Sequence, residues 1–252
     1  MTTTDFDLIA DAALAAKIAT SAGKLLLDLR LDASIQDPDE LRDEGDRRAH
    51  EHIMALLDKH FPDDAVLSEE GVDEKSRLRA ARTWIVDPLD GTNEYGFAER
   101  GDWGVHIALV IDHIAVLGAV AIPSLGITYG SGTVTPPMFG DTGRLKIAVS
   151  RSRRSTVAAV IADGLGAEIV RMGSAGAKAM AVVRGDVDIY AHSGGMYEWD
   201  SAAPVAVAAA AGLHTSRIDG SPLRYNHDDP WLPDLLICRR DVAAEVLAIV
   251  NR

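Results

Sequence analysis

The sequence predicts a layered α/β fold, in which helices cover β-sheets on both faces. Residues 114–122 are almost wholly apolar and residues 103–111 alternate only in part, as expected for strands covered on both faces. The second half of the chain alternates segments of strand type with segments of helix type, which is typical of an α/β layer. Its expected strands span 145–149, 167–171 and 187–190, and its expected helices begin at Thr156 and Ala175.

Length and composition limit the class of protein. The chain has 252 residues, of which 47% are apolar and 25% charged, as in a soluble globular protein of one large or two small domains. A net charge of -13 argues against a partner of duplex nucleic acid, because such binding requires a basic surface. The single cysteine, Cys238, excludes an internal disulfide.

Turn-forming residues mark a boundary near the middle of the chain. Pro136-Pro137 begins this boundary, and the segment 140–143 continues it. We therefore expect an N-terminal α/β half at 1–135, which carries most of the candidate site, and a C-terminal α/β half at 136–252.

The sequence contains no evident targeting or membrane segment. Residues 1–7 include acids and no basic residue, and apolar stretches such as 202–213 are too short to cross a bilayer. We expect a cytoplasmic protein without a membrane partner, either a monomer or a homodimer.

Two helices are expected before the first strand. The first spans 6–29, and 32–41 should be a loop. The second helix should begin near Asp43, an acceptable N-cap, and place Asp46 on its inward face. The expected apolar faces consist of Phe6, Ile9, Ala13, Ala16, Leu25 and Leu29 in the first helix, and Ala49, Ile53, Leu56 and Leu57 in the second.

The next segments read as short strands and their connections. Residues 65–67 form a strand that ends at Ser68-Glu69-Glu70, and 72–82 should be an exposed connector. Asp112-His113 fits a two-residue hairpin between the two apolar strands described above. His106 lies inside the first of these strands, and we interpret it as a core or edge residue.

The sequence around Asp87 to Thr92 carries the chemistry. Residues 84–86 form an expected buried strand, which should end at Asp87-Pro88 because proline cannot donate to a sheet. Two carboxylates then lie three positions apart, and carboxylate oxygens suit a hard cation such as Mg2+. Gly91 permits close approach of a phosphate to a helix that begins at Thr92. An ordinary Asp-Pro and Asp-Gly turn is an equally good interpretation of the motif taken alone.

The string Asp87-Pro88-Leu89-Asp90-Gly91-Thr92 resembles the signature of the inositol monophosphatase superfamily, whose members are Mg2+-dependent, lithium-sensitive phosphomonoesterases. Ser68-Glu69-Glu70 and Trp199-Asp200-Ser201-Ala202-Ala203-Pro204 resemble its second and last motifs, in the expected order. Taken alone, Glu69 could be a solvated surface acid and Asp200 the N-cap of a helix. The resemblance implies an αβαβα sandwich with the site at the junction of the two halves.

The resemblance also implies a ligand set and a mechanism. The Leu89 carbonyl and four carboxylates would hold two or three Mg2+ ions, and Glu69, Thr92 and Asp46 would activate a water. Asp43 stands where the family usually has threonine, and an inward Asp46 could instead be a first-turn acid. Carboxylates at ~4 Å repel by about 4 kcal/mol per pair at a dielectric of 20, so Asp90→Asn should abolish activity and leave the metal-free fold intact or slightly more stable. The four carboxylates of the implied metal set belong to Glu69, Asp87, Asp90 and Asp200.

Further matches indicate a branch of the family. Asn93-Glu94-Tyr95, Ser150-Arg151-Ser152 and the stretch from Gly173 to Lys178 resemble CysQ-type phosphatases, which cleave 3'-phosphoadenosine 5'-phosphate (PAP). The resemblance implies that Lys178, with the basic turn 151–154, faces the second phosphate, although both could be solvated surface charges. Inositol monophosphatase or fructose-1,6-bisphosphatase activity is the alternative, and a non-catalytic cation or nucleotide sensor is the rival class. The implied substrate-binding residues are Gly91, Thr92, Asn93, Ser150, Arg151, Ser174, Ala175 and Lys178.

Overall fold

The computed structural model describes residues 7–140, 143–152 and 155–251. Its helices are α1 (Leu8–Arg30), α2 (Pro38–His60), α3 (Thr92–Tyr95), α4 (Thr156–Leu165), α5 (Ala175–Arg184), α6 (Glu198–Ala210) and α7 (Ala243–Val250), with short 3-10 turns at Lys75–Arg79 and Pro123–Leu125. Its strands are β1 (Ala65–Ser68), β2 (Thr83–Asp90), β3 (Gly104–Ile111), β4 (Ile114–Ile122), β5 (Ile127–Gly130), β6 (Lys146–Ser150), β7 (Glu168–Met172), β8 (Ile189–Tyr197), β9 (His214–Ser216) and β10 (Trp231–Cys238).

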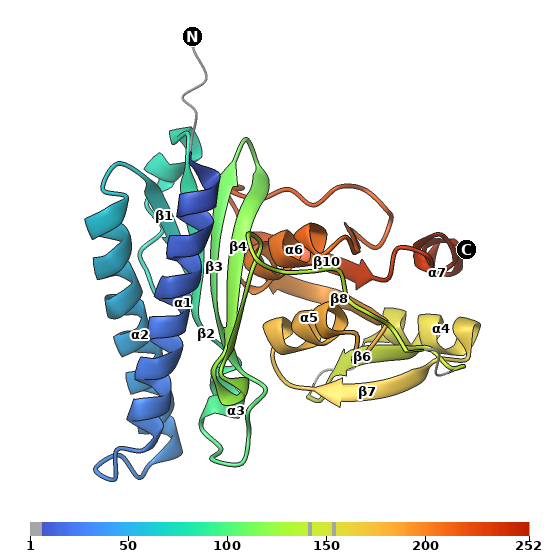
Figure 1. Cartoon of the computed structure of the whole chain (residues 1–252), viewed down its shortest axis with the longest axis horizontal. Coiled ribbons are helices and arrows are strands. Elements are labelled where there is room, and N and C mark those ends of the chain that lie inside the picture. Colours follow the sequence, from blue (N-terminus) through green and yellow to red (C-terminus); the bar gives the residue numbers. More distant parts are fainter. Residues whose placement is uncertain (1–6, 141–142, 153–154, 252) are drawn as a thin grey trace.

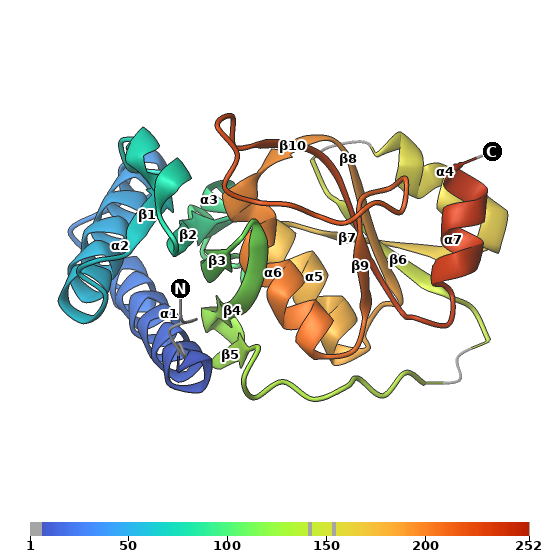
Figure 2. The same cartoon turned by 90° about the horizontal axis from the view of Figure 1, so that it is seen from above.

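The elements form five layers, and the layered α/β fold expected from the sequence is confirmed (Figures 1 and 2). Helices α1 and α2 cover one face of a sheet ordered β1-β2-β3-β4-β5. Helices α5 and α6 lie between that sheet and a second one, ordered β7-β6-β8-β10-β9. Helices α4 and α7 cover the outer face of the second sheet. The C-terminal end of β2 and the N-terminal ends of α5 and α6 therefore meet between the sheets.

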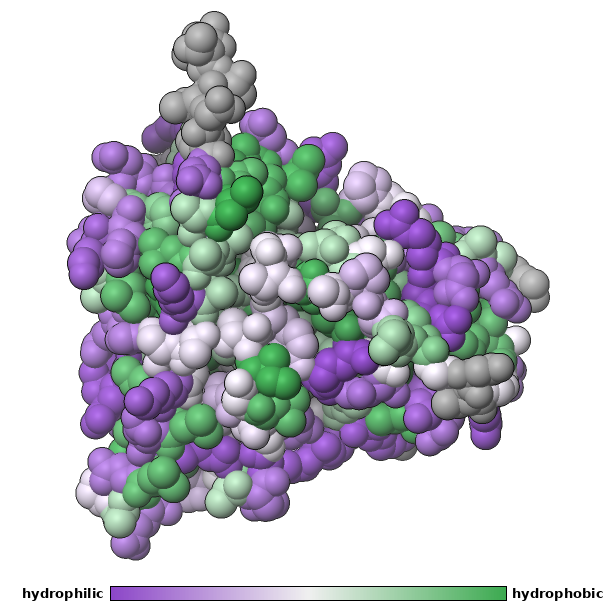
Figure 3. Space-filling view, in the orientation of Figure 1, coloured by the Kyte–Doolittle hydropathy of each residue, from purple (hydrophilic) through white to green (hydrophobic). Residues whose placement is uncertain are grey.

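Among the described residues, no helix is both long enough and apolar enough to cross a bilayer. On the face shown in Figure 3, hydrophilic and hydrophobic residues form a mosaic of patches.

The inward face of α1 differs from the predicted one. Only Leu29 of the predicted set is buried, while Ile9 is 84% exposed and Phe6 lies outside the described residues. Alanine occurs on every side of this helix, so hydrophobic spacing alone could not identify the face that packs. The buried residues are Ala12, Ala15, Ile18, Ala19, Ala22, Gly23, Leu26 and Leu29.

Helix α2 begins at Pro38 rather than at Asp43. Asp37 is its N-cap, and the Asp37 carboxylate accepts a hydrogen bond from the Asp39 N–H at 2.8 Å. Proline is favoured at the first helical position because the N–H that it lacks would have no partner there. The Asp37-Pro38 pair was interpreted as part of a loop, but it is the signal that starts the helix.

Strand β2 continues through Pro88 to Asp90, although the sequence predicted that it would end at Asp87. From Asp87 to Asp90 the strand advances three positions, while its partner β3 advances two, from His106 to Gly104. The extra residue makes a bulge, which tolerates a proline and re-aims the neighbouring side chains. Because β1 pairs with β2 only as far as Val86, the two aspartates lie where the central strand leaves the sheet.

The connector 72–82 is not uniformly exposed, as was predicted, because Arg77 is completely buried. Its guanidinium donates to both carboxylate oxygens of Asp73, at 2.6 and 2.9 Å, and to Asn226 Oδ1 at 2.6 Å. The Asn226 N–H in turn donates to the buried Glu198 carboxylate, at the first residue of α6. This network fixes the start of the helix that carries Asp200.

Candidate active site

Three carboxylates converge between the two sheets. Asp87 and Asp90 come from the end of β2, and Asp200 comes from the first turn of α6. One oxygen of each carboxylate lies within 4.8 Å of one oxygen of both others. Asp200 is not the N-cap of α6, which is Tyr197; its carboxylate accepts the Tyr197 N–H at 2.7 Å. That bond holds the Asp200 carboxylate at the helix N-terminus.

The two aspartates of β2 have opposite electrostatic environments. Burial raises the pKa of Asp87 well above its usual range, and the charges of Glu69, Asp90 and Asp200 raise it further. Burial alone would also raise the pKa of Asp90. The charge of His106, the hydrogen bond from His106 and the charge of Lys178 outweigh burial and hold the pKa of Asp90 at about 2. Asp87 therefore gains most from a bound cation, whereas Asp90 is already stabilised as an anion.

Asp90 also joins the two sheets. It accepts hydrogen bonds from the backbone N–H groups of Ala175, at 3.1 Å, and Gly176, at 2.5 Å, at the start of α5. A Cβ at Gly176 would lie 2.1 Å from His106 Nε2, so only glycine fits between this histidine and the helix. The predicted Asp-Gly-Thr motif and the glycine-containing turn at 173–178 are thus in direct contact.

His106 is buried as expected, but it belongs to the site. Its Nε2 lies 3.1 Å from Asp90 Oδ2, and its Nδ1 lies 3.2 Å from the Trp199 carbonyl oxygen. Burial alone would lower the pKa of His106, yet the charge of Asp90 raises it above its usual range. The pairing of β2 with β3 could have indicated that His106 belongs to the site, because it places His106 directly opposite Asp87.

Glu69 lies directly after β1 and lines the same pocket as Asp90 and Asp200. It lies outside the group of three oxygens within 4.8 Å, among the residues described. Burial raises the pKa of Glu69 to about 7, and the charges of Asp200 and Glu70 raise it further. A cation between Glu69 and the aspartates would relieve this repulsion.

Asp46 and Thr92 approach each other from α2 and α3. Thr92 Oγ1 lies 3.4 Å from Asp46 Oδ1 and 3.1 Å from the Leu89 carbonyl oxygen. Burial raises the pKa of Asp46 to about 7, with further contributions from the charges of Glu70 and Glu69. A carboxyl group of that pKa can exchange a proton near neutral pH.

These groups border a pocket of about 290 Å³. Among the sequence-predicted residues, Asp46, Asp87, Leu89 and Arg151 are not on its wall. Three wall residues on β8, Tyr190, His192 and Met196, were not predicted. The predicted residues on the wall are Glu69, Asp90, Gly91, Thr92, Asn93, Ser150, Ser174, Ala175, Lys178 and Asp200.

Lys178 is on the pocket wall but is only 4% exposed. Its Nζ donates to the carbonyl oxygens of Gly173 and Ser174, at 2.5 and 2.6 Å, and lies 5.3 Å from the centre of the Tyr190 ring. Burial lowers the pKa of Lys178 to about 8, against the charges of Asp90 and Glu94, which raise it. Two of its three protons thus stabilise the turn before α5.

Arg151 is held by acids from the first half of the chain. Its Nη2 lies 2.9 Å from Asp102 Oδ2, and its Nη1 lies 3.9 Å from Glu94 Oε1 and has no hydrogen-bond partner among the described residues. Asp102, which the sequence analysis missed, also accepts the Gly173 N–H at 2.7 Å. Arg153 and Arg154 of the predicted basic turn lie outside the described residues.

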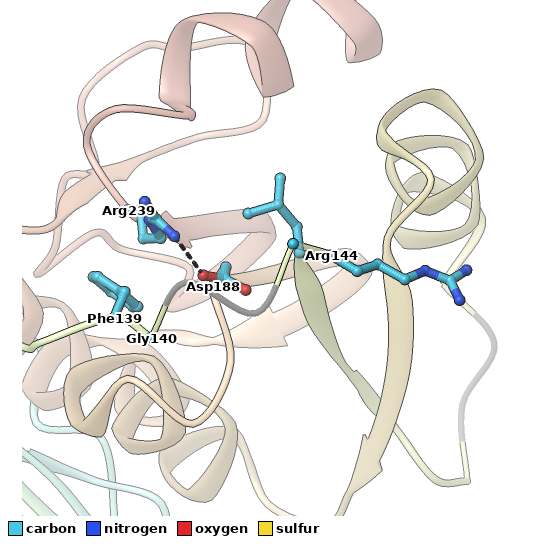
Figure 4. A pocket seen from close by; sticks show the side chains of 7 residues that line it. Phe139, Gly140, Arg144, Asp188 and Arg239 are labelled. Atoms are coloured by element: carbon cyan, nitrogen blue, oxygen red, sulfur yellow. Dashed lines mark hydrogen bonds and ion pairs between the residues drawn. The ribbon is translucent and has the colours of Figure 1, made fainter.

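A second cavity, of about 310 Å³, lies away from these acids and is lined by Phe139, Gly140, Arg144, Asp188 and Arg239, among others (Figure 4). The Arg239 guanidinium already binds Asp188 at 3.0 Å and Asp241 at 2.6 Å. The charge of Arg239 is therefore neutralised. The group formed by Asp87, Asp90 and Asp200 does not line this cavity. The sequence-predicted acids that line a pocket therefore line the one around Asp90 and not this cavity.

The donor set of the acidic pocket fits a hard divalent cation. All candidate ligands are carboxylate or carbonyl oxygens, which Mg2+ and similar ions prefer. Burial and, after it, the charges of the neighbouring acids raise the pKa values of Asp87 and Glu69, and a bound cation would offset both effects. The acidic cluster could therefore bind a metal ion.

Known proteins resemble the chain over most of its length. The sequence profile of the inositol monophosphatase family matches residues 2–250. A 3'-phosphoadenosine 5'-phosphate phosphatase of Mycobacterium leprae (strain TN) is 50% identical, over 96% of this chain and 94% of its own length. The 3'(2'),5'-bisphosphate nucleotidase CysQ of Escherichia coli (strain K12) is 32% identical, over 75% and 80% of the two chains. The crystal structure of CysQ from Bacteroides thetaiotaomicron has a TM-score of 0.80 and 28% identity, and the match covers 94% of this chain and 99% of that one.

Proposed function

The chain belongs to the inositol monophosphatase family, and on that premise we propose that it hydrolyses the 3'-phosphate of PAP to give AMP and phosphate. The observation that carries the proposal is one pocket, lined by Glu69, Asp90 and Asp200 and also by Lys178, with Arg151 close by. The names of the most similar curated relatives support the same substrate. Cytoplasmic localisation and a monomeric or homodimeric state stay predictions.

We assign two or three Mg2+ ions to the acidic cluster. Their ligands would be the Leu89 carbonyl and the carboxylates of Glu69, Asp87, Asp90 and Asp200. When bound, such ions lower the pKa of a coordinated water and supply positive charge to the phosphate oxygens. The hydrogen bonds from Ala175 and Gly176 would keep the Asp90 carboxylate oriented toward the cluster.

Thr92 and Asp46 orient the attacking water in this proposal. If the Thr92 hydroxyl donates to Asp46 Oδ1, its lone pairs are free to accept a proton of the water. The proton released by the attack then passes through Thr92 Oγ1 to Asp46 Oδ1. The water attacks phosphorus in line with the departing ribose oxygen, which keeps the electron pair of the broken P–O bond and takes a proton from solvent, so no covalent phosphoenzyme is required.

The substitution Glu70→Gln tests the role of Asp46 through the pH dependence of kcat. The charge of Glu70 raises the pKa of Asp46, so its removal lowers that pKa, and the basic form of Asp46 persists to lower pH. The acidic limb of kcat against pH should therefore shift to lower pH at saturating Mg2+. An unchanged limb, or a shift to higher pH, would show that Asp46 does not control it.

The second phosphate of PAP requires a positive partner on the protein, which we assign to Arg151 and Lys178. Arg151 offers an Nη1 without a hydrogen-bond partner in the described part of the chain, which an oxygen of the substrate could satisfy. Lys178 has one ammonium proton beyond those that hold Gly173 and Ser174. Asn93, Ser150 and Ser174 on the wall provide uncharged polar groups.

Arg151→Gln tests this assignment with two substrates. A charge-assisted contact contributes about 1.5–3 kcal/mol, so kcat/KM for PAP should fall roughly tenfold to a hundredfold. Hydrolysis of inositol 1-phosphate, which has no second phosphate, should scarcely change. Lys17→Gln, on the exposed side of α1, makes the same charge change as a control. Equal losses on both substrates would remove Arg151 from the second-phosphate site.

Release of phosphate from a substrate panel tests the function itself. We expect PAP to be preferred over inositol 1-phosphate and fructose 1,6-bisphosphate, with no release after removal of Mg2+. A preference for inositol 1-phosphate would assign the chain to the monophosphatase alternative. Binding of PAP without any hydrolysis would instead support the sensor.

A further inference from the structure

We propose that Asp102 is a positioning residue for the second phosphate of the substrate, because it holds the Arg151 guanidinium with one N–H group left for that phosphate; this rests on the proposed function. Asp102 Oδ2 lies 2.9 Å from Arg151 Nη2 and accepts the Gly173 N–H at 2.7 Å. The Asp102 main-chain oxygen accepts the Ser174 N–H at 3.1 Å. One residue of the first half thus contacts two separate segments of the second half, the residue after β6 and the turn before α5.

The backbone around Asp102 is held on both sides. Trp103, the next residue, is completely buried. On the other side, the Arg30 guanidinium at the end of α1 donates to the Arg100 carbonyl oxygen at 3.0 Å and to that of Phe97. A carboxylate on such a fixed backbone can set the position of a longer and more flexible partner.

Arg151 is that partner. Its guanidinium is planar, so binding at Nη2 also fixes the direction of Nη1. Nη1 is buried, has no hydrogen-bond partner in the part of the chain that is described, and lies 3.9 Å from Glu94 Oε1. Glu94 lines the pocket, so this edge of the guanidinium is on the pocket side. A buried donor without a partner is costly, and an oxygen of the second phosphate would satisfy it.

The same carboxylate oxygen connects Arg151 with Lys178. Gly173 donates its N–H to Asp102 Oδ2, and its carbonyl oxygen accepts a hydrogen bond from Lys178 Nζ at 2.5 Å. A Cβ at Gly173 would lie 2.8 Å from the Asp102 main-chain oxygen and 2.6 Å from Glu94 Cγ, so only glycine permits this close approach. Asp102 therefore holds both cations assigned to the second phosphate in one arrangement.

A carboxylate near a phosphate site also repels the phosphate, and this effect opposes the benefit of positioning. The repulsion is reduced because Asp102 Oδ2 is shared by a cation and an N–H donor. Without Asp102, the substrate itself would have to order the Arg151 side chain, which is 34% exposed, and that ordering lowers affinity. We therefore expect that the loss of positioning outweighs the loss of repulsion.

The experiment compares Asp102→Asn with wild type on PAP and on adenosine 3'-phosphate, which lacks the second phosphate. Asparagine keeps the size of the side chain and an oxygen for the Gly173 N–H, but it removes the charge that holds Arg151. For PAP, kcat/KM should fall roughly tenfold to a hundredfold, chiefly through KM, which is the effect of one charge-assisted contact. For adenosine 3'-phosphate, kcat/KM should stay within about twofold of wild type. Asp163→Asn, at an exposed position of α4, makes the same charge change as a control.

Binding and two further variants separate positioning from a structural role. In calorimetry, Asp102→Asn should weaken binding of AMP, which keeps the 5'-phosphate, but not binding of adenosine. Asp102→Asn combined with Arg151→Gln should be little worse on PAP than Arg151→Gln alone, because the carboxylate acts through the guanidinium. Arg151→Lys should lose as much as Arg151→Gln, because a single ammonium that binds Asp102 lacks the second arm of the guanidinium.

The outcomes distinguish this inference from the function on which it rests. If wild type cleaves PAP but Asp102→Asn leaves KM for PAP unchanged, lowers it, or affects both substrates equally, the positioning role is wrong and the PAP phosphatase remains. Additive losses in the double variant would contradict it in the same way. If wild type does not cleave PAP, both proposals are wrong. Should Asp102→Asn fail to fold by circular dichroism, Arg151→Lys decides, because full activity on PAP would show that no fixed guanidinium is needed.

Discussion

Asp87→Asn is expected to reduce phosphate release by at least roughly 10²–10³-fold, the effect of removing one charge-stabilising group from a hydrolase site. The same change should make the metal-free protein more stable at pH 7, by ~1–3 kcal/mol. Asp87 is buried and its pKa is raised, so its ionised form opposes folding. Denaturant unfolding in a chelator measures this gain, which should disappear below about pH 4, where the carboxyl is protonated in the unfolded chain also.

Asp90→Asn provides the contrast, because it should abolish activity and lower stability. The pKa of Asp90 is about 2 in the folded chain, so ionised Asp90 stabilises the fold at all pH values above its unfolded pKa. The neutral amide would weaken the bonds from Ala175, Gly176 and His106. Asp163→Asn, at an exposed position of α4, is the control and should change neither property. Stabilisation by Asp90→Asn would show that His106 and the start of α5 do not favour the ionised carboxylate.

Thr92→Val should lower kcat by roughly 10²–10⁴-fold, the range of a positioned acid–base group, and change the affinity for Mg2+ much less. The valine keeps the size of the side chain and removes the hydroxyl that contacts both Asp46 and the Leu89 carbonyl oxygen. Turnover at saturating Mg2+ and metal binding by calorimetry measure the two effects separately.

Thr92→Ser and a double variant complete this test. Serine keeps a hydroxyl and should recover most of the turnover. Asp46→Asn combined with Thr92→Val should be little worse than either change alone, because residues that act as a unit are not additive. Full additivity, or loss of metal with normal turnover at saturating Mg2+, would show that the pair does not handle the water.

The sequence by itself determined the fold class and the chemical type of the site. Unbroken apolar segments and their alternation with helices required covered sheets, as is found. The acids of the motifs lie at or just after the ends of short buried strands or in the first turn of a helix, and these are local patterns that a single segment specifies. Family resemblance then placed Glu69, Asp90, Thr92, Lys178 and Asp200, which are separated in sequence, in one pocket, and the structure brings them together there.

Tertiary structure alone decided the electrostatics of that pocket. The sequence treated Asp87 and Asp90 as equivalent members of a repulsive cluster, and it predicted that Asp90→Asn would preserve or improve stability. His106 Nε2 lies 3.1 Å from Asp90 Oδ2, whereas its Nδ1 lies 4.0 Å from Asp87 Oδ2, and the start of α5 donates its hydrogen bonds to Asp90. One carboxylate is therefore held as an anion and its neighbour is not. The difference arises from the register of β2 against β3 and from the packing of α5, a helix of the second half, against Asp90. Neither can be inferred from residues 87–92 alone.

The same reason explains the residues that sequence analysis missed. Asp102 acquires its role only because Gly173 and Arg151, far along the chain, pack against it. Local sequence specifies which side chains are available at the end of each element. Long-range packing specifies which of them meet, and in this protein that sets both the charge state of the acidic cluster and the shape of the pocket beside it.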